Sequence, residues 1–382
     1  MNHRSRLISP FLAHRRRVLG EGGAGTVQQK LLQKAAAETP VQTAPKRFYR
    51  FGHRVNVGGY FVSPKWFDQE LLLKEDVKLS AACLQRPDGV VSQANRLFNE
   101  EQERQRALVS RIEKIEVILE KPFPTHDDVV LMMNRSISTP YDCAAHISEL
   151  LRNRSALAVV DGTKSWHMHQ PLENSCHLRL LHFKHDDPMP VNYAFWRSCS
   201  MLLASVVKRA FKEEHPVAIL SPPMSDLAGG SFVVDASIAS LPDTWTPTTE
   251  ELRSFTSLLW DEVTANRHFE RLQVSADTAR KLFAGDAKRL AQIGEASSSS
   301  DTTTFTVYRV GDHIELCEEA LIASTGLIGS IFTSAVHRIS TPNGGTFYRF
   351  QGVALPRQLH INAYAFSLIR DRAKQLNSVG LS

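Results

Sequence analysis

The sequence lacks the marks of several common protein classes. No window approaches the roughly 18 consecutive apolar residues that a membrane-spanning helix needs, so we expect no span. The five cysteines are scattered, odd in number and without a Cys-x-x-Cys pair. A disulfide framework is therefore not expected in a chain of this length, and a reducing compartment is favoured. No internal repeat is visible.

Acidic residues are scarce at the start of the chain. Among the first 37 positions Glu21 is the one acid, against seven arginines and lysines, and only short apolar groups lie between them. This composition is typical of a mitochondrial presequence, although a disordered basic tail or a polyanion-binding tail would look similar.

Residues 1–121 carry 21 Lys and Arg against 13 Asp and Glu, whereas the remainder carries 24 against 27. The basic excess is confined to the first third of the chain, and this distribution favours an N-terminal region that binds a polyanion.

The strongest nucleic-acid signal is the segment KRFYRFGHR at residues 46–54, which holds four basic residues, three aromatics and no acid. Aromatic faces can stack on bases while Arg and Lys neutralise phosphates, so the segment predicts contact with RNA. The alternative is a strand with a solvated basic edge that runs into residues 55–62. The candidate RNA-binding residues are Lys46, Arg47, Tyr49, Arg50 and Arg54.

Residues 92–118 alternate Arg and Glu along a predicted long helix, with Leu97, Leu108 and Ile112 on its apolar stripe. Such a charged helix is either a solvated connector or lies against a larger partner. Strands are then expected at 114–119 and 129–133, a helix from Tyr141, and strands around ALAVVDG and HLRLLHF. Strand–strand–helix–strand–strand is the pattern of a β-grasp module.

Residues 195–212 predict a mostly buried helix at the centre of a second domain, because apolar residues recur there near helical spacing. Strands and helices then interleave with antiparallel hairpins, and Thr248 or Thr249 is expected to cap a helix. The fold class is therefore α+β. The expected regions are a presequence and linker (1–45), a basic extension with the charged helix (46–112), a β-grasp domain (113–188), an α/β two-layer domain (189–360) and a C-terminal helix (361–382).

His167 and His169 are a candidate metal or stacking site, because in a strand their side chains would lie on the same face. No third ligand lies near them in the sequence, and histidines on edge strands are common. We therefore expect no metal and no cofactor.

Several segments resemble threonyl-tRNA synthetases. STPYDCAAHISELLRN, ALAVVDG and PLENSCHLRLLHF resemble the TGS module, and SFVVDA, FERLQVSADTARKLF, YRVGDHIELC and YRFQGVALP follow in the order of the editing domain. The resemblance covers residues 113–376 and implies a TGS-like β-grasp domain followed by an editing-like α/β two-layer domain. A narrower resemblance is to a synthetase-related protein family of the mitochondrial large ribosomal subunit, carried by residues 95–117, 138–149, 158–162, 195–203, 252–256 and 349–356.

The resemblance also locates the editing site. In the synthetases, His-x-x-x-His on the opening helix and Cys-x-x-x-His after the Gly-Asp strand hold a water and the misacylated ester. By this resemblance the four positions fall on Arg197, Met201, Cys317 and Leu321. A fixed cation and two apolar side chains can neither ligate a metal nor take a proton, so catalysis is not expected. Cys317 is interpreted as a small buried hydrophobic residue.

The resemblance implies a structural, non-catalytic ribosomal protein of the mitochondrial matrix. Its implied partners are large-subunit rRNA and neighbouring ribosomal proteins, with no small-molecule substrate, and phosphate contacts would give salt-dependent affinity without base specificity. Two alternatives stay open. A freestanding hydrolase would deacylate seryl-tRNA(Thr), and a soluble RNA-binding regulator would be found away from the large subunit.

Overall fold

The structure is a computed structural model of the 382-residue chain. It describes residues 92–109, 111–123, 125–211, 215–224, 227–239, 241, 245–299, 304–341 and 345–381. The presequence-like start and the predicted RNA-contacting residues Lys46, Arg47, Tyr49, Arg50 and Arg54 lie outside the described residues.

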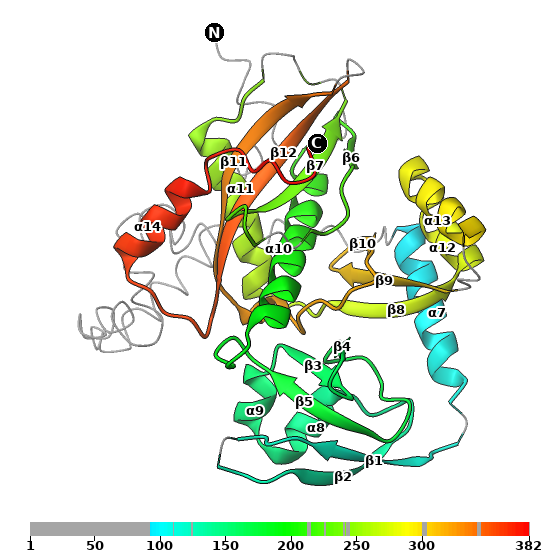
Figure 1. The fold of residues 1–382 in the computed structure, drawn as a ribbon. Coiled ribbons are helices and arrows are strands. Elements are labelled where there is room, and N and C mark those ends of the chain that lie inside the picture. The colour runs from blue at the N-terminus through cyan, green and yellow to red at the C-terminus, as the bar shows by residue number, and fades with distance from the viewer. Residues whose placement is uncertain are drawn as a thin grey trace, which may run out of the picture.

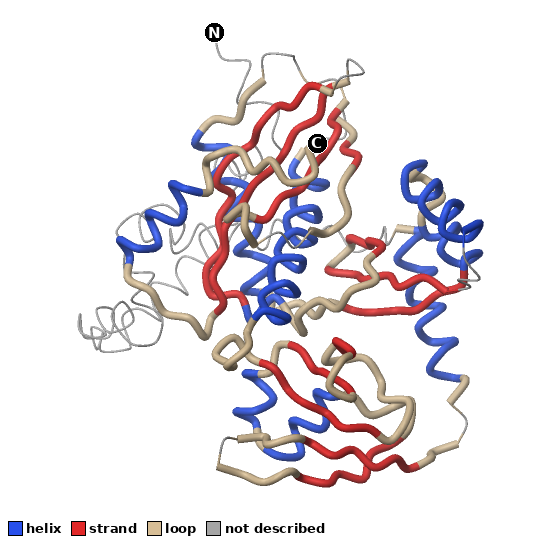
Figure 2. The backbone as a smooth tube through the Cα atoms, in the orientation of Figure 1, coloured by secondary structure: helices blue, strands red, loops and turns tan. Residues whose placement is uncertain are grey.

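The described chain forms three β-sheets with helices packed beside them, which confirms the α+β class. A five-stranded sheet lies at the bottom of the view, a four-stranded sheet stands above it, and a three-stranded sheet lies to the right (Figure 1). Figure 2 shows helices beside all three sheets. Of the helices in the described residues, none is both long and apolar enough to cross a bilayer.

The five-stranded sheet has the order β2-β1-β5-β3-β4, with β1 and β5 parallel and the other neighbours antiparallel. The predicted strands and the helix near Tyr141 are present within a residue or two, and Thr139 opens that helix through a capping box with Asp142. The elements are β1 (Lys114–Leu119), β2 (Val129–Asn134), α8 (Pro140–Ile147), α9 (Glu149–Arg154), β3 (Leu157–Val160), β4 (Lys164–Trp166) and β5 (Cys176–Leu181).

The four-stranded sheet has the order β11-β12-β7-β6 and carries helices on both faces. Phe350 of β12 packs against Phe211 and Phe255, on the side of α10 and α11. Since side chains alternate along a strand, Arg349 and Gln351 point to the opposite face, where they contact the C-terminal segment. The elements are α10 (Met189–Ala210), β6 (Val217–Ile219), β7 (Phe232–Ile238), α11 (Thr249–Thr264), the 3-10 turn η2 (Thr325–Leu327), β11 (Ile328–Ser340), β12 (Thr346–Pro356) and α14 (Ala363–Arg372).

The central helix α10 is largely buried, as predicted. Fifteen of its 22 residues are buried, and it packs on β7 and α11. It begins at Met189 rather than near Phe195, because Pro190 in the first turn is compatible with a helix start. The predicted cap of α11 is also confirmed, with Thr248 and Glu251 forming a capping box.

The three-stranded sheet has the order β10-β9-β8 and forms a small lobe with three helices. Its separate core includes Leu272, Val274 and Val307 from the sheet and Phe98 from α7. The elements are α7 (Gln93–Ala107), β8 (Glu270–Ser275), α12 (Ala276–Leu282), α13 (Ala287–Ser299), β9 (Thr304–Val310) and β10 (His313–Leu316).

The charged helix differs from its prediction in length and in apolar face. α7 ends at Ala107, well before residue 118, and the residue that docks it is Phe98, which is fully buried. Leu108 and Ile112, predicted on the apolar stripe, are 66% and 65% exposed. The Arg309 guanidinium lies 4.2 Å from the Phe98 ring centroid. The helix is therefore a packed part of the small lobe and not only a solvated connector.

The docking of α7 can be tested by deleting its anchor. Phe98→Ala leaves a cavity in the small-lobe core, and we expect it to lower the free energy of unfolding by about 3–5 kcal/mol in urea titrations. The exposed Leu108→Ala serves as control and should change it by less than about 0.5 kcal/mol. Equal effects of the two changes would show that α7 does not pack as described.

Candidate functional site

A cavity of about 590 Å³ opens where α10, the segment after β6, α13 and the end of β10 meet. Its walls are mostly apolar, and its charged groups are one arginine and two glutamates. A space of this size falls within the range of small-ligand pockets. The lining residues are Arg197, Pro222, Pro223, Met224, Gln292, Ala296, Phe305, Leu316, Cys317, Glu318, Glu319 and Val379.

The four positions assigned to the editing site are split between this cavity and the core. Arg197 and Cys317 line the cavity. Met201 and Leu321 are both 0% exposed and belong to the main hydrophobic core. Two places where the resemblance puts histidines are thus filled by apolar side chains that take part in packing.

Arg197 is held at the base of the cavity by its own neighbours. Its guanidinium donates a hydrogen bond to the Ala320 carbonyl at 2.9 Å and forms an ion pair with Glu319. The Arg197 side chain is 9% exposed and that of Glu319 69%, so the pair runs from the core to the cavity mouth. Burial lowers the pKa of Arg197. A guanidinium has no acceptor lone pair, so it cannot act as the base that hydrolysis needs.

Two further polar groups of the cavity are also engaged. The Glu318 carboxylate accepts the Thr306 backbone N–H at 3.1 Å. The Cys317 thiol donates to the Glu319 carbonyl at 3.3 Å, and burial raises the pKa of Cys317 to about 12. The thiolate is the nucleophile and the metal ligand, so this cysteine is inert near neutral pH. Within the described residues, no group of three or more His, Cys, Asp or Glu could hold a metal ion.

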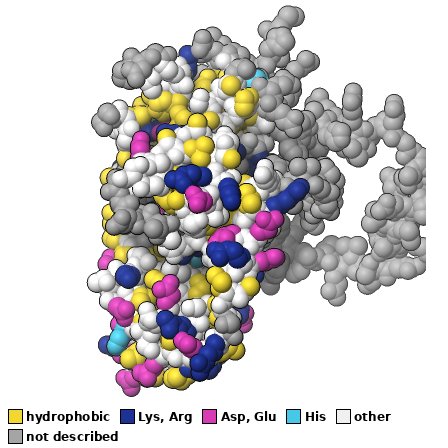
Figure 3. All heavy atoms as spheres, turned by 90° about the vertical axis from the view of Figure 1, so that its right-hand side faces the viewer, with side chains coloured by type: hydrophobic (Ala, Val, Ile, Leu, Met, Phe, Trp, Pro, Cys, Tyr) yellow, Lys and Arg dark blue, Asp and Glu magenta, His cyan; other side chains and the backbone are white. Residues whose placement is uncertain are grey.

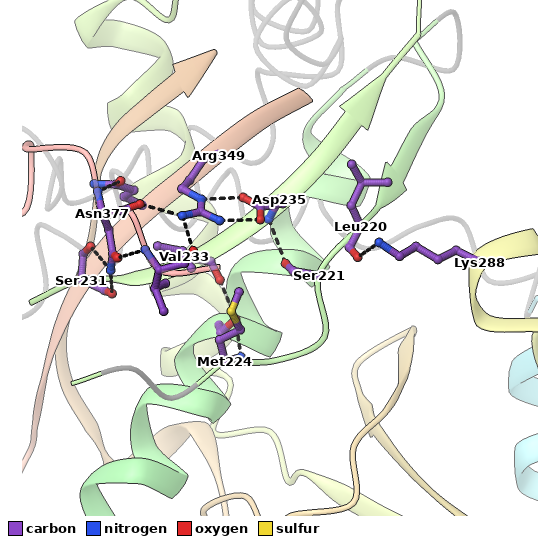
Figure 4. A network of polar contacts seen from close by, with 12 residues as sticks. Leu220, Ser221, Met224, Ser231, Val233, Asp235, Lys288, Arg349 and Asn377 are labelled. Atoms are coloured by element: carbon purple, nitrogen blue, oxygen red, sulfur yellow. Dashed lines mark hydrogen bonds and ion pairs between the residues drawn. The ribbon is translucent and has the colours of Figure 1, made fainter. Parts of the chain in front are cut away.

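Ser200 of α10 makes two hydrogen bonds, one to β7 and one to the proline-containing wall of the cavity (Figure 4). The Ser200 hydroxyl donates to the Val233 carbonyl at 2.7 Å and accepts the Met224 N–H at 3.4 Å. The opposite wall is anchored by Arg289 of α13, which pairs with Glu315 and donates to the Ser221 carbonyl. The cavity therefore keeps its walls through contacts that do not involve a ligand.

A buried ion pair brings the C-terminal segment to the cavity (Figure 4). Arg349 of β12 is 0% exposed, and its guanidinium makes two hydrogen bonds of 2.7 Å to the Asp235 carboxylate on β7. Its third nitrogen donates to the carbonyls of Asn377 and Val379 at 2.6 and 2.7 Å. Val379 is thereby placed in the cavity wall. We call Arg349, Asp235 and these two carbonyls the C-terminal clamp.

Amide side chains complete the clamp. Gln351 donates to the carbonyls of Ala373 and Gln375 and accepts the Asn377 N–H at 2.7 Å. Asn377 donates in turn to the Ser231 carbonyl at 2.9 Å. Sequence reasoning missed this network, although a charged residue within an apolar strand, as in SFVVDA and YRFQG, is a signal for a buried pair.

The histidine pair is placed differently from its prediction. His167 and His169 follow β4 in a loop and do not share a strand face. His167 is 0% exposed, lies against the Tyr308 ring and has its Nε2 3.3 Å from the Ile322 carbonyl, whereas His169 lies 3.1 Å from His268. Burial lowers the pKa of His167 to about 3 and that of His169 to about 4. Both are therefore neutral packing groups at the contact between the five-stranded sheet and the rest.

The comparison with known proteins assigns the family. No family model matches the chain. It is 40% identical over 286 residues to the large ribosomal subunit protein mL39 of Drosophila melanogaster, an alignment that covers 75% of this chain and 84% of that protein. The chain belongs to the mL39 family.

This member of the mL39 family also shares sequence with threonine–tRNA ligases. It is 30% identical over 224 residues to the mitochondrial ligase of Rattus norvegicus, and 27% identical over 223 residues to cytoplasmic ligase 2 of Mus musculus. These alignments cover 58% and 57% of the chain but only 28% and 26% of the ligases. The predicted relation to these synthetases is confirmed. Because the longer match is to a ribosomal protein, the comparison also supports the prediction that the chain is not an enzyme.

The clamp gives a stability prediction. Asp235→Asn leaves the buried Arg349 guanidinium without its counter-charge, and we expect a loss of about 3–5 kcal/mol in the free energy of unfolding. The control is Asp371→Asn, which breaks the Asp371–Lys374 pair of equal length, 2.7 Å, at the surface. Chemical denaturation should show no measurable shift for the control. A shift of similar size in both variants would contradict the role given to burial.

The environment of Cys317 gives a reactivity prediction. With a pKa of about 12, the thiol is ionised to about one part in ten thousand at pH 8. Iodoacetamide at pH 8 should therefore leave Cys317 unmodified in the folded protein and alkylate it after denaturation, as read by peptide mass spectrometry. Rapid alkylation of the folded chain at Cys317 would reveal an activated nucleophile and would count against a non-catalytic cavity.

Proposed function

We propose that the chain is a structural component of the large subunit of the mitochondrial ribosome. The observation that carries the proposal is 40% identity over 75% of the chain to a large ribosomal subunit protein. The cavity adds support, because its arginine, its thiol and its two carboxylates are all bound to neighbouring groups. In this proposal the scaffold is descended from a threonyl-tRNA synthetase, has no hydrolytic activity, and acts in the mitochondrial matrix.

The proposal includes a domain assignment. Residues 113–188, with two helices on a mixed five-stranded sheet, are assigned as a TGS-like β-grasp domain. Residues 189–360 are assigned as the editing-like domain, residues 1–45 as presequence and linker, residues 46–112 as the basic extension, and residues 361–382 as the C-terminal region. The packing of α7 on the small lobe means that the extension and the editing-like domain share one core.

Contact with rRNA is assigned to the basic segment at residues 46–54, through Lys46, Arg47, Tyr49, Arg50 and Arg54. The surface of the described residues has no comparable basic segment on the face that Figure 3 shows. On the face seen in Figure 3, Lys and Arg side chains are interspersed with Asp and Glu. A surface of mixed sign attracts phosphates weakly and suits contacts with protein. We therefore assign rRNA contact to the N-terminal third and protein contact to the folded domains.

Sedimentation tests the proposal. A tagged chain expressed in mitochondria should co-migrate with the large subunit on a sucrose gradient and shift with it when the subunit joins the small subunit. Protein confined to the light fractions, beside a soluble matrix marker, would overturn the ribosomal assignment and favour the soluble regulator.

A deacylation assay with the purified chain tests the alternative that the protein is a hydrolase. Incubated with seryl-tRNA(Thr), it should release serine no faster than the protein-free blank, because the three assigned histidine positions carry Arg197, Met201 and Leu321, none of which can take a proton. Turnover above the blank that is lost in Cys317→Ala would restore the enzymatic alternative.

A further inference from the structure

The five-stranded domain (residues 113–188) meets the rest of the molecule at a sparse boundary. Two chain connections join the two parts, from α7 to β1 and from β5 to α10 (Figure 1). One hydrophobic cluster runs across the boundary, but within the described residues no helix or strand of the domain packs broadly on one outside it. Among these residues, the hydrogen bonds that cross the boundary are made by His167, His169 and Gln358. Histidines therefore carry much of the polar contact between the two parts.

His167 can keep its two hydrogen bonds only in the neutral form. Its Nε2 lies 3.3 Å from the Ile322 carbonyl, which accepts and cannot donate, so this nitrogen carries the proton. Its Nδ1 accepts the His169 backbone N–H at 3.3 Å, so this nitrogen presents a lone pair. A second proton on the ring displaces that N–H. Because His167 is 0% exposed, the displaced group finds no water in its place.

The His169 and His268 rings meet across the same boundary. Nε2 of His169 lies 3.1 Å from Nδ1 of His268, so one nitrogen donates and the other accepts. The contact survives a first proton, because a charged His268 can donate to a neutral His169. A second proton leaves two donors of like charge facing each other. Since His268 is exposed and His169 is half-buried, the ring that must stay neutral is His169.

The charges around the two rings do not offset a proton at His167 and offset one only in part at His169. Burial is the largest effect at both, and it lowers the pKa of His167 to about 3 and that of His169 to about 4. Asp142 favours charge on His169, whereas Arg271 opposes charge on His167. The titratable groups that face the rings from other elements are Tyr141 and Asp142 of α8, His268, Arg271 of β8 and Tyr308 of β9.

We propose that these contacts form a pH-sensitive latch between the five-stranded domain and the rest of the chain. The latch consists of His167, His169, His268 and the Ile322 carbonyl. It is closed while His167 and His169 are neutral, and it opens when both take up protons, so that the domain separates from its neighbours without unfolding. The inference goes beyond the proposed function and does not rest on it, because it concerns the free chain.

The direction of the effect follows from proton linkage. In the open form both rings have the ordinary histidine pKa of about 6.5, whereas in the closed form their pKa values are about 3 and about 4. The latch is therefore at full strength above about pH 6.5 and weakens as the pH falls toward these lower values. Between pH 8 and pH 5 the opening equilibrium rises by about thirtyfold for each of the two rings.

Hydrogen exchange of the His169 amide measures this equilibrium, because that N–H is bound to Nδ1 of His167. Exchange in the purified full chain is followed from pH 8 to pH 5 at single-residue resolution by mass spectrometry and corrected for the intrinsic effect of pH. We expect the protection of this amide to fall by at least about a hundredfold, while β12 stays better protected at every pH. A flat profile would overturn the latch. Equal rates at His169 and in β12 would also overturn it, because they indicate global unfolding.

His169→Gln tests the proton uptake. Glutamine keeps an amide that can bond to His268 but takes no proton, so the rise in exchange at position 169 should shrink by about thirtyfold. The control His177→Gln removes a histidine of the same domain whose side chain is 56% exposed, and it should leave the rise unchanged. Thermal melting at pH 8 checks that both variants fold. An undiminished rise in His169→Gln would refute the assignment of the proton to this ring.

Gln358→Ala tests whether the domain separates or only the histidine loop moves. Gln358 follows β12 and donates to the Arg154 carbonyl at the end of α9, at 2.6 Å. If the two parts separate, losing this bond should speed exchange of the His169 amide by about fivefold at every pH. The matched control Gln105→Ala loses a bond of the same kind and length, 2.6 Å to the Gln273 carbonyl within the small lobe, and should have no effect. Unchanged exchange in Gln358→Ala would show movement of the loop alone and overturn the proposal.

Discussion

The buried pair between Arg349 and Asp235 is the interaction on which much of the four-stranded sheet depends. Taking two charges out of water costs several kcal/mol per ion unless each polar atom finds a partner. Here the carboxylate receives two hydrogen bonds and the guanidinium gives the remaining ones to backbone carbonyls. Because a buried donor without a partner is costly, Arg349 connects β12 both to β7 and to the C-terminal residues Asn377 and Val379.

The cavity persists because its walls belong to structures that the fold needs for other reasons. Ser200 ties the proline segment to α10, and Arg289 ties α13 to the same segment. Met201 and Leu321 pack in the hydrophobic core, and the space beside Arg197 stays open. Apolar packing at these two positions is therefore compatible with a cavity beside them.

The parts that sequence reasoning predicted well are those governed by local rules. The predicted strand at 114–119 has the bounds of β1, helical spacing marked most of α10, and the cap predicted at Thr248 or Thr249 is Thr248. The contacts that were missed join residues far apart in the sequence. His169 and His268 are 99 positions apart, and Arg349 and Asp235 are 114 apart. Alternating charges on α7 concealed Phe98, whose burial depends on a sheet that begins at Glu270.

The clamp also has a consequence for the timing of folding. Arg349 and Gln351 need acceptors supplied by residues 373 to 379, so the opposite face of the four-stranded sheet lacks its partners until those residues dock against it. The five-stranded sheet, complete at Leu181, has no such dependence. The five-stranded sheet can therefore pair all its strands without the C-terminal residues, whereas the four-stranded sheet gains the partners of Arg349 and Gln351 only when residues 373 to 379 dock against it.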